Sequence, residues 1–170
     1  MKVVIQTQYR ENYAAHNEGY VHGVSEPYWK FKGGETFVLS CSVRAAMDAD
    51  FRQAAFDAIS FSNEMAEEYV IDYSIIDDAL FDISNHIEKW EFPTYLSHDG
   101  ENFTAKKITD NRPDEDGYRY SAMRDEILEL VETWTVGPEN ERLNYKGLYL
   151  MTDGSKIPQE KIRQWIKEAA

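Results

Sequence analysis

The longest periodic pattern in the sequence runs from residue 63 to residue 90. It follows a suitable N-cap at Ser62 or Asn63, and its apolar residues recur at steps of three or four. These residues are Met65, Tyr69, Tyr73, Ile76, Leu80, Ile83, Ile87 and Trp90. At 3.6 residues per turn they share one face, which predicts a long amphipathic helix. The alternative is a strand over Tyr69–Ile76, where β-forming residues are concentrated and would divide the helix. We favour the helix, with a kink in that stretch.

Shorter patterns predict the remaining elements. Alternating apolar and polar residues predict a strand over Lys2–Tyr9, and Ser42 can cap a helix that ends near Ile59. The runs 27–32 and 35–41 flank Gly33-Gly34 and predict a hairpin, because tight hairpin turns need positive φ angles. The other expected elements are a hairpin of strands 94–97 and 103–108, a strand over 143–151, a helix over 121–134, and a final helix from Pro158.

These elements predict a single α+β domain over residues 1–170, an antiparallel sheet of hairpins packed with three to four helices. The one cysteine, Cys41, cannot form an internal disulfide, which favours a reducing compartment. The N-terminus turns polar at Gln6, too early for a signal peptide, and no stretch approaches the roughly 18 apolar residues of a membrane span. We therefore expect a cytoplasmic protein with no membrane contact.

Negative charge is concentrated in the middle of the sequence. The chain has a formal net charge of −13, and residues 48–101, with fourteen acidic and two basic residues, contribute −12 of it. Binding to nucleic acid is not expected, because it requires a basic surface that neutralises phosphates. A concentrated acidic segment instead indicates a face that meets a basic partner.

On the expected helix, six acidic residues lie opposite the apolar face or at its edge and form the candidate binding site: Glu64, Glu67, Glu68, Asp72, Asp78 and Asp82. From residue 64 to residue 82 this face spans about 27 Å, a length over which one DNA strand presents about eight phosphates. The face is therefore predicted to mimic one nucleic-acid strand and to bind a basic groove on a partner protein, such as that of a nuclease or another nucleic-acid enzyme. The alternative is a helix face that is merely solvated.

Motifs for catalysis are absent from the sequence. There is no G-x-x-x-x-G-K, no G-x-G-x-x-G after a strand and no G-x-S-x-G. We expect no cofactor, and we favour a protein that is not an enzyme. His16 and His22 with Glu18 and Glu26 match no known metal-site spacing, and the acidic segment 110–117 fails the register of a calcium loop. We therefore expect no metal site.

A second hypothesis is a small enzyme or ligand-binding domain that uses the polar loop after the first strand, where functional residues often lie. Its site residues would be Arg10, Glu11, His16 and His22, with Tyr28, Trp29 and Phe31 as an aromatic wall. A third expectation is a contact between subunits of a homo-oligomer, because the chain has eleven tyrosines and tyrosine is enriched at interfaces.

The opening MKVVIQTQYRENY (residues 1–13) and the later YWKFKGG (residues 28–34) resemble small uncharacterised proteins of tailed bacteriophages. The resemblance covers mainly the first forty residues and transfers no site residue. It implies expression in a bacterial cytoplasm and an accessory role, such as blocking host defence or redirecting host machinery. The sequence thus predicts a phage-type accessory protein that inhibits or redirects a host protein through an acidic helix face.

Overall fold

The chain folds around one twisted, mixed β-sheet. The structure, a computed structural model, describes residues 1–88, 91–112, 115–116, 127–137, 142–158, 160–161, 163–164 and 167. Its strands are β1 (Lys2–Asn12), β2 (Trp29–Gly33), β3 (Thr36–Ser40), β4 (Phe61–Ser62), β5 (Ala66–Ile76), β6 (Thr94–His98), β7 (Phe103–Asp110), β8 (Ile127–Val136), β9 (Arg142–Met151) and β10 (Lys156–Pro158). Their order is β10-β9-β8-β7-β6-β3-β1-β5-β4, and β2 pairs with β1. Among these described strands, β3 and β6 pair in parallel and the other neighbours are antiparallel.

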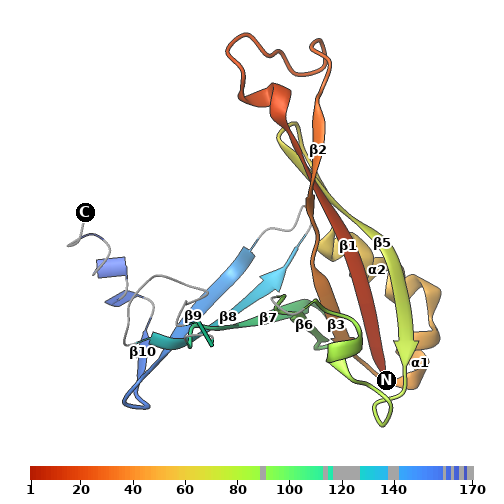
Figure 1. Cartoon of the computed structure of the whole chain (residues 1–170). Helices are drawn as coiled ribbons and strands as arrows, with labels where there is room; N and C mark the ends of the chain where they lie inside the picture. Colours follow the sequence, from red (N-terminus) through yellow and green to blue (C-terminus); the bar gives the residue numbers. More distant parts are fainter. Residues whose placement is uncertain are drawn as a thin grey trace.

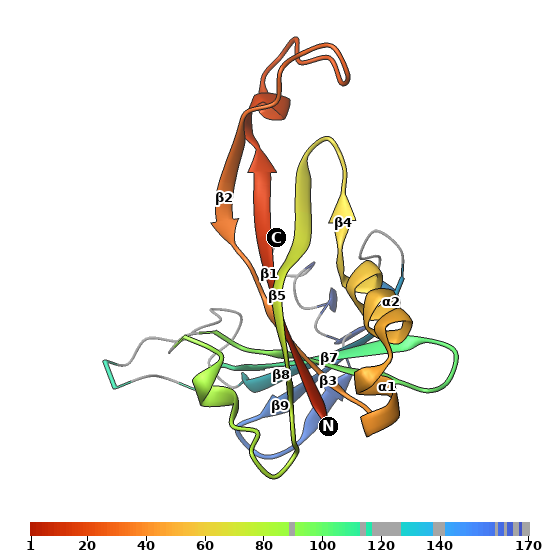
Figure 2. The ribbon, with the colours of Figure 1, turned by 90° about the vertical axis from the view of Figure 1, so that its right-hand side faces the viewer.

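Strands, not helices, dominate the described part of the chain. Its α-helices with defined bounds are α1 (Val43–Met47) and α2 (Ala49–Ile59), and its short 3-10 helices are η1 (Tyr13–His16) and η2 (Ile83–Asn85). The predicted α+β fold, with three to four helices packed on hairpins, is therefore wrong. The two α-helices follow one another beside β5 (Figures 1 and 2).

The long helix predicted over residues 63–90 is wrong, and the alternative, a strand over Tyr69–Ile76, is correct. The described part of the segment forms β5 and η2. The apolar residues assigned to the helix face do not share one side of β5, because Tyr69 lies opposite Val70, and pairing with β1 skips Ile71 and leaves it as an extra residue, a β-bulge. Val70 and Tyr73 therefore face the same side three residues apart, where a regular strand has steps of two. The bulge thus interrupts the alternation that would have indicated a strand.

The helix predicted over residues 121–134 is wrong in its described part for the same reason. Residues 121–126 lie outside the described residues, and the chain from Ile127 onward forms β8. The pairing of β8 with β9 changes register between Ile127 and Glu129 and again between Thr133 and Thr135. Two irregularities within ten residues conceal the alternation that would have indicated a strand.

Gly33 and Gly34 kink a returning strand and do not turn a hairpin. β3 pairs with the first half of β1 and β2 with its second half, and both are antiparallel to it. β2 and β3 therefore run in the same direction, and the predicted hairpin between them is wrong. A Cβ atom on Gly34 would collide with the backbone carbonyl of Thr7, so the close approach of the two backbones requires glycine.

Other local predictions are confirmed. β1, β3 and β9 lie where expected, and β6 and β7 form the predicted hairpin. Ser42 caps α1 by accepting a hydrogen bond of 3.1 Å from the Ala45 N–H. The predicted helix to Ile59 is interrupted at Asp48, whose carboxylate accepts hydrogen bonds at the start of α2. Residues 160, 161, 163, 164 and 167 of the final predicted helix are helical, and Ile162, Trp165 and Ile166 lie outside the described residues.

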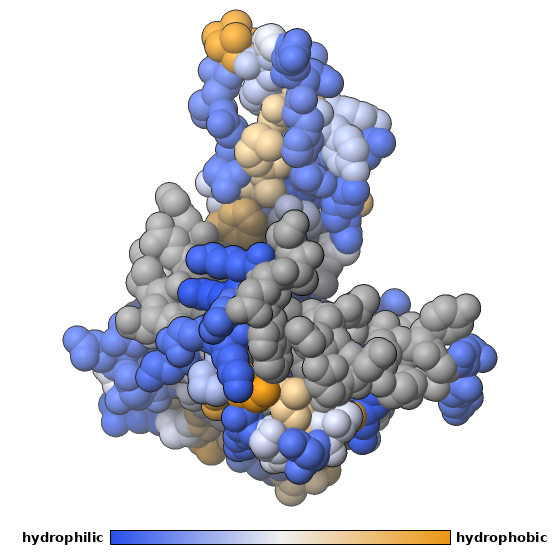
Figure 3. Space-filling model, turned by 90° about the vertical axis from the view of Figure 1, so that its left-hand side faces the viewer, coloured by the Kyte–Doolittle hydropathy of each residue, from blue (hydrophilic) through white to orange (hydrophobic). Residues whose placement is uncertain are grey.

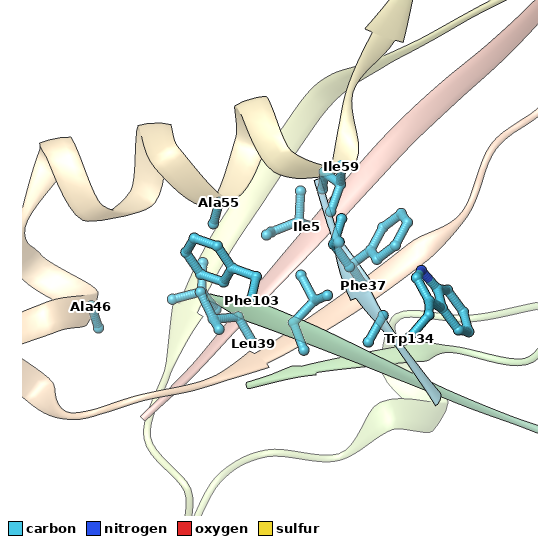
Figure 4. Close-up of a cluster of buried hydrophobic side chains, with 12 residues drawn as sticks. Ile5, Phe37, Leu39, Ala46, Ala55, Ile59, Phe103 and Trp134 are labelled. Carbon is cyan, nitrogen blue, oxygen red and sulfur yellow. The ribbon is translucent and has the colours of Figure 1, made fainter. Parts of the chain in front are cut away.

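The main core lies between the two α-helices and the twisted sheet (Figure 4). Ile5 of β1 and Leu39 of β3 are fully buried against Ala55 of α2. Phe103 and Trp134 extend the cluster to β7 and β8. Ala46 of α1 and Ala55 of α2 belong to the same buried cluster, so small side chains of the helices pack together with large aromatic rings of the sheet.

An arm projects from this body. We define the arm as residues 9–33, which comprise the outer part of β1, the loop with η1, and β2. Figures 1 and 2 show the arm rising beyond the rest of the molecule, with the turn between β4 and β5 beside it in Figure 2. Hydrophobic surface lies at the end of the arm (Figure 3). The arm carries the candidate site.

Candidate binding site on the arm

An open groove of about 890 Å³ lies between the arm loop and the turn that joins β4 to β5. We call it the arm groove. Its chemically distinctive lining residues are Tyr20, His22, Trp29, Ser62, Glu64 and Glu67. The volume falls in the range of pockets that hold small molecules or short peptide segments. The groove therefore combines aromatic rings with two carboxylates on a projecting part of the molecule.

Asn12, at the end of β1, holds the two walls of the groove together. Its side chain is fully buried and donates hydrogen bonds to the Tyr20 hydroxyl (3.0 Å) and the Glu64 carbonyl (2.9 Å). Its amide oxygen accepts from the N–H groups of Ala14 (3.2 Å) and Tyr28 (2.9 Å). All the polar capacity of this amide is used inside the protein, so Asn12 has a structural role. The loop wall is thereby fixed to the β4–β5 turn.

Arg10 contacts two residues that line the groove, Trp29 and Glu67. Its Nε donates a hydrogen bond of 2.6 Å to the Glu67 carboxylate, which lies opposite it on β5. Its guanidinium lies 4.7 Å from the centroid of the Trp29 ring and 5.8 Å from that of Tyr69. Glu67 also accepts a hydrogen bond of 3.2 Å from the Ser62 hydroxyl. Arg10 and Ser62 thus already engage the Glu67 carboxylate.

Glu64 is the more accessible carboxylate of the groove. Its side chain is 49% exposed, against 20% for Glu67. Nδ1 of His22, from the opposite wall, lies 3.4 Å from a Glu64 carboxylate oxygen. A cation that enters the groove from solvent would meet Glu64 first.

The end of the arm presents apolar side chains next to the groove. Val21 and Val24 are 53% and 80% exposed. They lie in a turn in which the Ser25 hydroxyl accepts a hydrogen bond from the Val21 N–H and the Val21 carbonyl accepts from the N–H of Ser25. A short ordered turn thus holds two exposed apolar side chains beside the acidic groove.

The opposite face of the arm is basic. Glu11 of β1 lies opposite Lys30 of β2, which is the neighbour of Trp29 in the sequence. Because neighbouring residues of a strand point to opposite faces, the side chains of Glu11 and Lys30 lie on the face of the arm away from Trp29. The ammonium groups of Lys30 and Lys32 lie 4.5 and 4.8 Å from the centroid of the Tyr13 ring. The Tyr13 hydroxyl and the Glu11 carboxylate raise the pKa of Lys32. The acidic groove and this basic face therefore lie on opposite sides of the arm.

The six acidic residues of the predicted helix face do not share one surface, because the described part of this segment forms β5 and η2 and not a long helix. Glu64 and Glu67 line the arm groove, whereas Glu68 is buried on the other side of β5. Asp72 is exposed further along β5. Asp78 pairs with the N-terminal ammonium at 2.8 Å, which lowers the pKa of Asp78. The Ser84 hydroxyl and N–H bind Asp82 and lower the pKa of Asp82. The phosphate-spacing comparison depended on a helical rise and does not apply to this structure.

The loop residues of the second hypothesis are divided between the two faces of the arm. Arg10 and His22 reach the groove side, where they meet Glu67 and Glu64. Glu11 and His16 lie on the basic face, where Nε2 of His16 is 3.1 Å from a carboxylate oxygen of Glu11. The structure thus brings two residues of each predicted site together at one groove. Of the predicted aromatic wall, Trp29 lines that groove, whereas Tyr28 and Phe31 are exposed.

Sequence reasoning missed the structural role of Asn12 and the contribution of Tyr20. A signal for Asn12 was present, because an asparagine that ends an alternating strand often bonds to nearby backbone groups. No comparable signal marked Tyr20, which meets Asn12 only through the path of the loop.

Other reactive groups do not assemble into a second site in the described part of the chain. There, no group of three or more His, Cys, Asp or Glu residues could hold a metal ion. Burial raises the pKa of the Cys41 thiol, which makes it a weak nucleophile. Arg112 binds the Asp110 carboxylate and lowers the pKa of Asp110. Among the described residues, no helix has the length and apolar character needed to cross a bilayer.

Comparison with protein-family models, with curated proteins and with solved structures gives no match for this chain. Its function is therefore inferred from the arm groove itself.

Proposed function

We propose that the chain is a non-catalytic binding protein that holds a basic surface of a partner protein in the arm groove. The observation that carries this proposal is the exposed Glu64 carboxylate of the β4–β5 turn, which lines one groove with Trp29 and Tyr20 of the projecting arm. The walls of the groove are fixed by Asn12, so its shape exists before a partner arrives. Preformed walls reduce the ordering cost of binding.

The charge of the chain supports a basic partner. The groove carboxylates belong to the segment 48–101, which holds −12 of the net charge of −13. Charge of one sign over a large part of a surface attracts an oppositely charged partner and raises the rate of encounter. The groove then supplies the specific contact, and the exposed apolar residues Val21 and Val24 add area around it.

The resemblance to tailed-phage accessory proteins makes a host protein in the bacterial cytoplasm the partner under this proposal. Binding would then inhibit or redirect that host protein. Proteins that handle nucleic acid are suitable partners, because they expose basic grooves rich in arginine and lysine.

Capture from bacterial lysate with three baits tests the proposal. The baits are the unaltered chain, Glu64→Lys, and the control Glu101→Lys, which makes the same charge change in the exposed turn between β6 and β7. Captured proteins are identified and purified, and their affinities are then measured at about 50 mM and about 500 mM salt. We expect a partner with a basic surface whose affinity falls at least tenfold in Glu64→Lys and at high salt, and less than twofold in Glu101→Lys. Equal binding by the two variants, or no captured protein that distinguishes them, would contradict the proposal.

A further inference from the structure

We propose that the group recognised in the arm groove is an arginine side chain, which stacks on Trp29 and pairs with Glu64. This inference rests on the proposed function and names the chemistry of the partner at that site.

The protein already contains one example of this recognition. The Arg10 guanidinium lies over the Trp29 ring at 4.7 Å and donates to Glu67 at 2.6 Å. This arrangement shows that Trp29 and a neighbouring carboxylate on this side of the arm accept a guanidinium at favourable distances. Because Arg10 and Ser62 engage Glu67, a second guanidinium has Glu64 as its accessible carboxylate.

Arg10 also prepares the site for a second cation. Its contacts to Trp29 and Glu67 restrain the indole ring that lines the groove. The charge of Glu67 is compensated by Arg10, whereas the ion-pair partner of Glu64 among the described residues is the imidazole of His22, whose Nδ1 lies 3.4 Å from a Glu64 carboxylate oxygen. When that histidine is neutral, the rim of the groove carries an uncompensated negative charge.

Arginine fits this groove better than lysine or a neutral group. A guanidinium is planar, so it stacks on an indole and donates two parallel hydrogen bonds to one carboxylate, whereas an ammonium is a compact point charge. The groove volume of about 890 Å³ exceeds one side chain and leaves room for the adjoining peptide backbone. The exposed Val21 and Val24 then lie next to the residues that flank the arginine.

A titration with a small arginine probe tests this inference without the natural partner. The probe is N-acetyl-arginine methylamide, and its neutral isostere, N-acetyl-citrulline methylamide, is the matched control. The readout is the indole N–H resonance of Trp29 in an NMR spectrum, assigned with Trp29→Phe. The pH is about 8, where histidine is neutral. We expect a saturable shift with the arginine probe and at least a fivefold weaker response with the citrulline and lysine analogues.

Two variants localise the interaction. Glu64→Gln removes a carboxylate from an exposed turn and leaves the Glu64 carbonyl that binds Asn12 in place, so the fold is retained. It should weaken the arginine response at least fivefold, whereas Glu101→Gln should leave it unchanged. An unmoved Trp29 resonance, an equal response to citrulline, or an equal response in the two variants would overturn the inference.

Failure of this inference can be separated from failure of the proposed function. If a captured partner depends on Glu64 but the arginine probe leaves Trp29 unmoved, the binding function stands and arginine recognition is wrong. If the probe binds and no partner depends on Glu64, the groove accepts arginine and the proposed function is wrong.

Discussion

The Thr7 hydroxyl donates a hydrogen bond of 2.7 Å to the Glu68 carboxylate at the level where the arm leaves the body. The Thr7 oxygen also accepts from the Glu35 N–H at 2.8 Å, and the Glu35 carboxylate pairs with Lys107 at 2.7 Å. These contacts connect β1, β5 and β7 through the kink between β2 and β3. Burial raises the pKa of Glu68, whose residue is only 5% exposed, and the negative charge of Glu35 adds to this effect. The Thr7 hydrogen bond and the positive charge of Lys107 oppose it.

Glu68→Gln is expected to stabilise the protein at neutral pH. The amide removes a buried charge and keeps an oxygen that accepts the Thr7 hydrogen bond, so the free energy of unfolding should rise by on the order of 1 kcal/mol. A raised pKa means that the native state binds the Glu68 proton more readily than the unfolded state does. The contribution of Glu68 to the free energy of unfolding therefore falls as pH rises from the unfolded-state pKa to the raised native-state pKa. The advantage of glutamine should therefore shrink as pH is lowered from neutrality toward the ordinary glutamate value of 4.5. Urea unfolding of the unaltered protein and of Glu68→Gln, at neutral pH and at pH 4.5, measures the difference in their free energies of unfolding. A difference that does not change with pH would contradict the role given to Glu68.

Asn12→Ala is expected to release the arm loop from the β4–β5 turn. The change leaves the Tyr28 N–H and the Glu64 carbonyl without their side-chain partner, at a cost of about 2–4 kcal/mol for several lost hydrogen bonds. Hydrogen exchange should accelerate at least tenfold for amides of residues 13–28 and remain unchanged in β6 and β7. Asn17→Ala, at an exposed position of the same loop, is the control and should alter neither region. Unchanged protection of the loop in Asn12→Ala would show that other contacts fix the groove.

Gly34→Ala is expected to destabilise the junction between arm and body. Its Cβ would collide with the Thr7 carbonyl, and because backbone atoms cannot turn aside, the two strands must separate locally. We expect a loss of roughly 3 kcal/mol or more in the free energy of unfolding. Gly23→Ala is the matched control, since Gly23 has φ 74° but open space around a new Cβ, and it should cost only about 1 kcal/mol. Equal losses in thermal or urea unfolding would contradict the close approach at Gly34.

The sequence predicted those elements whose side-chain pattern is regular. β1 alternates over its inner half, and Ser42 begins a helix with a capping hydroxyl, so both were recognised. β5 and β8 were mistaken for helices because register shifts in their pairing with neighbouring strands interrupt the alternation of side chains. Such bulges depend on pairing with a distant strand, and local periodicity carries no information about that pairing.

The residues of the candidate site were divided between two separate predictions. Glu64 and Glu67 were assigned to a helix face, and Arg10 and His22 to a loop site, yet the structure brings these pairs together across the arm groove. The return path of β2 beside β1 creates this arrangement, and the kink at Gly34 makes it possible. Gly33-Gly34 predicts a hairpin turn by its tolerance of positive φ angles, but a close backbone approach also requires glycine, so the pair alone does not distinguish a turn from a kink.

Site-specific photo-crosslinking tests most directly whether the arm groove is the contact surface. A photoreactive phenylalanine derivative replaces Val24, which is 80% exposed at the end of the arm, and in a second protein it replaces Glu101, in the turn between β6 and β7. Each protein is irradiated with the partner identified by capture. The account predicts a crosslink from position 24 that is lost when Glu64→Lys is added, and none from position 101. A crosslink from position 101 alone, or one from position 24 that persists with Glu64→Lys, would contradict it.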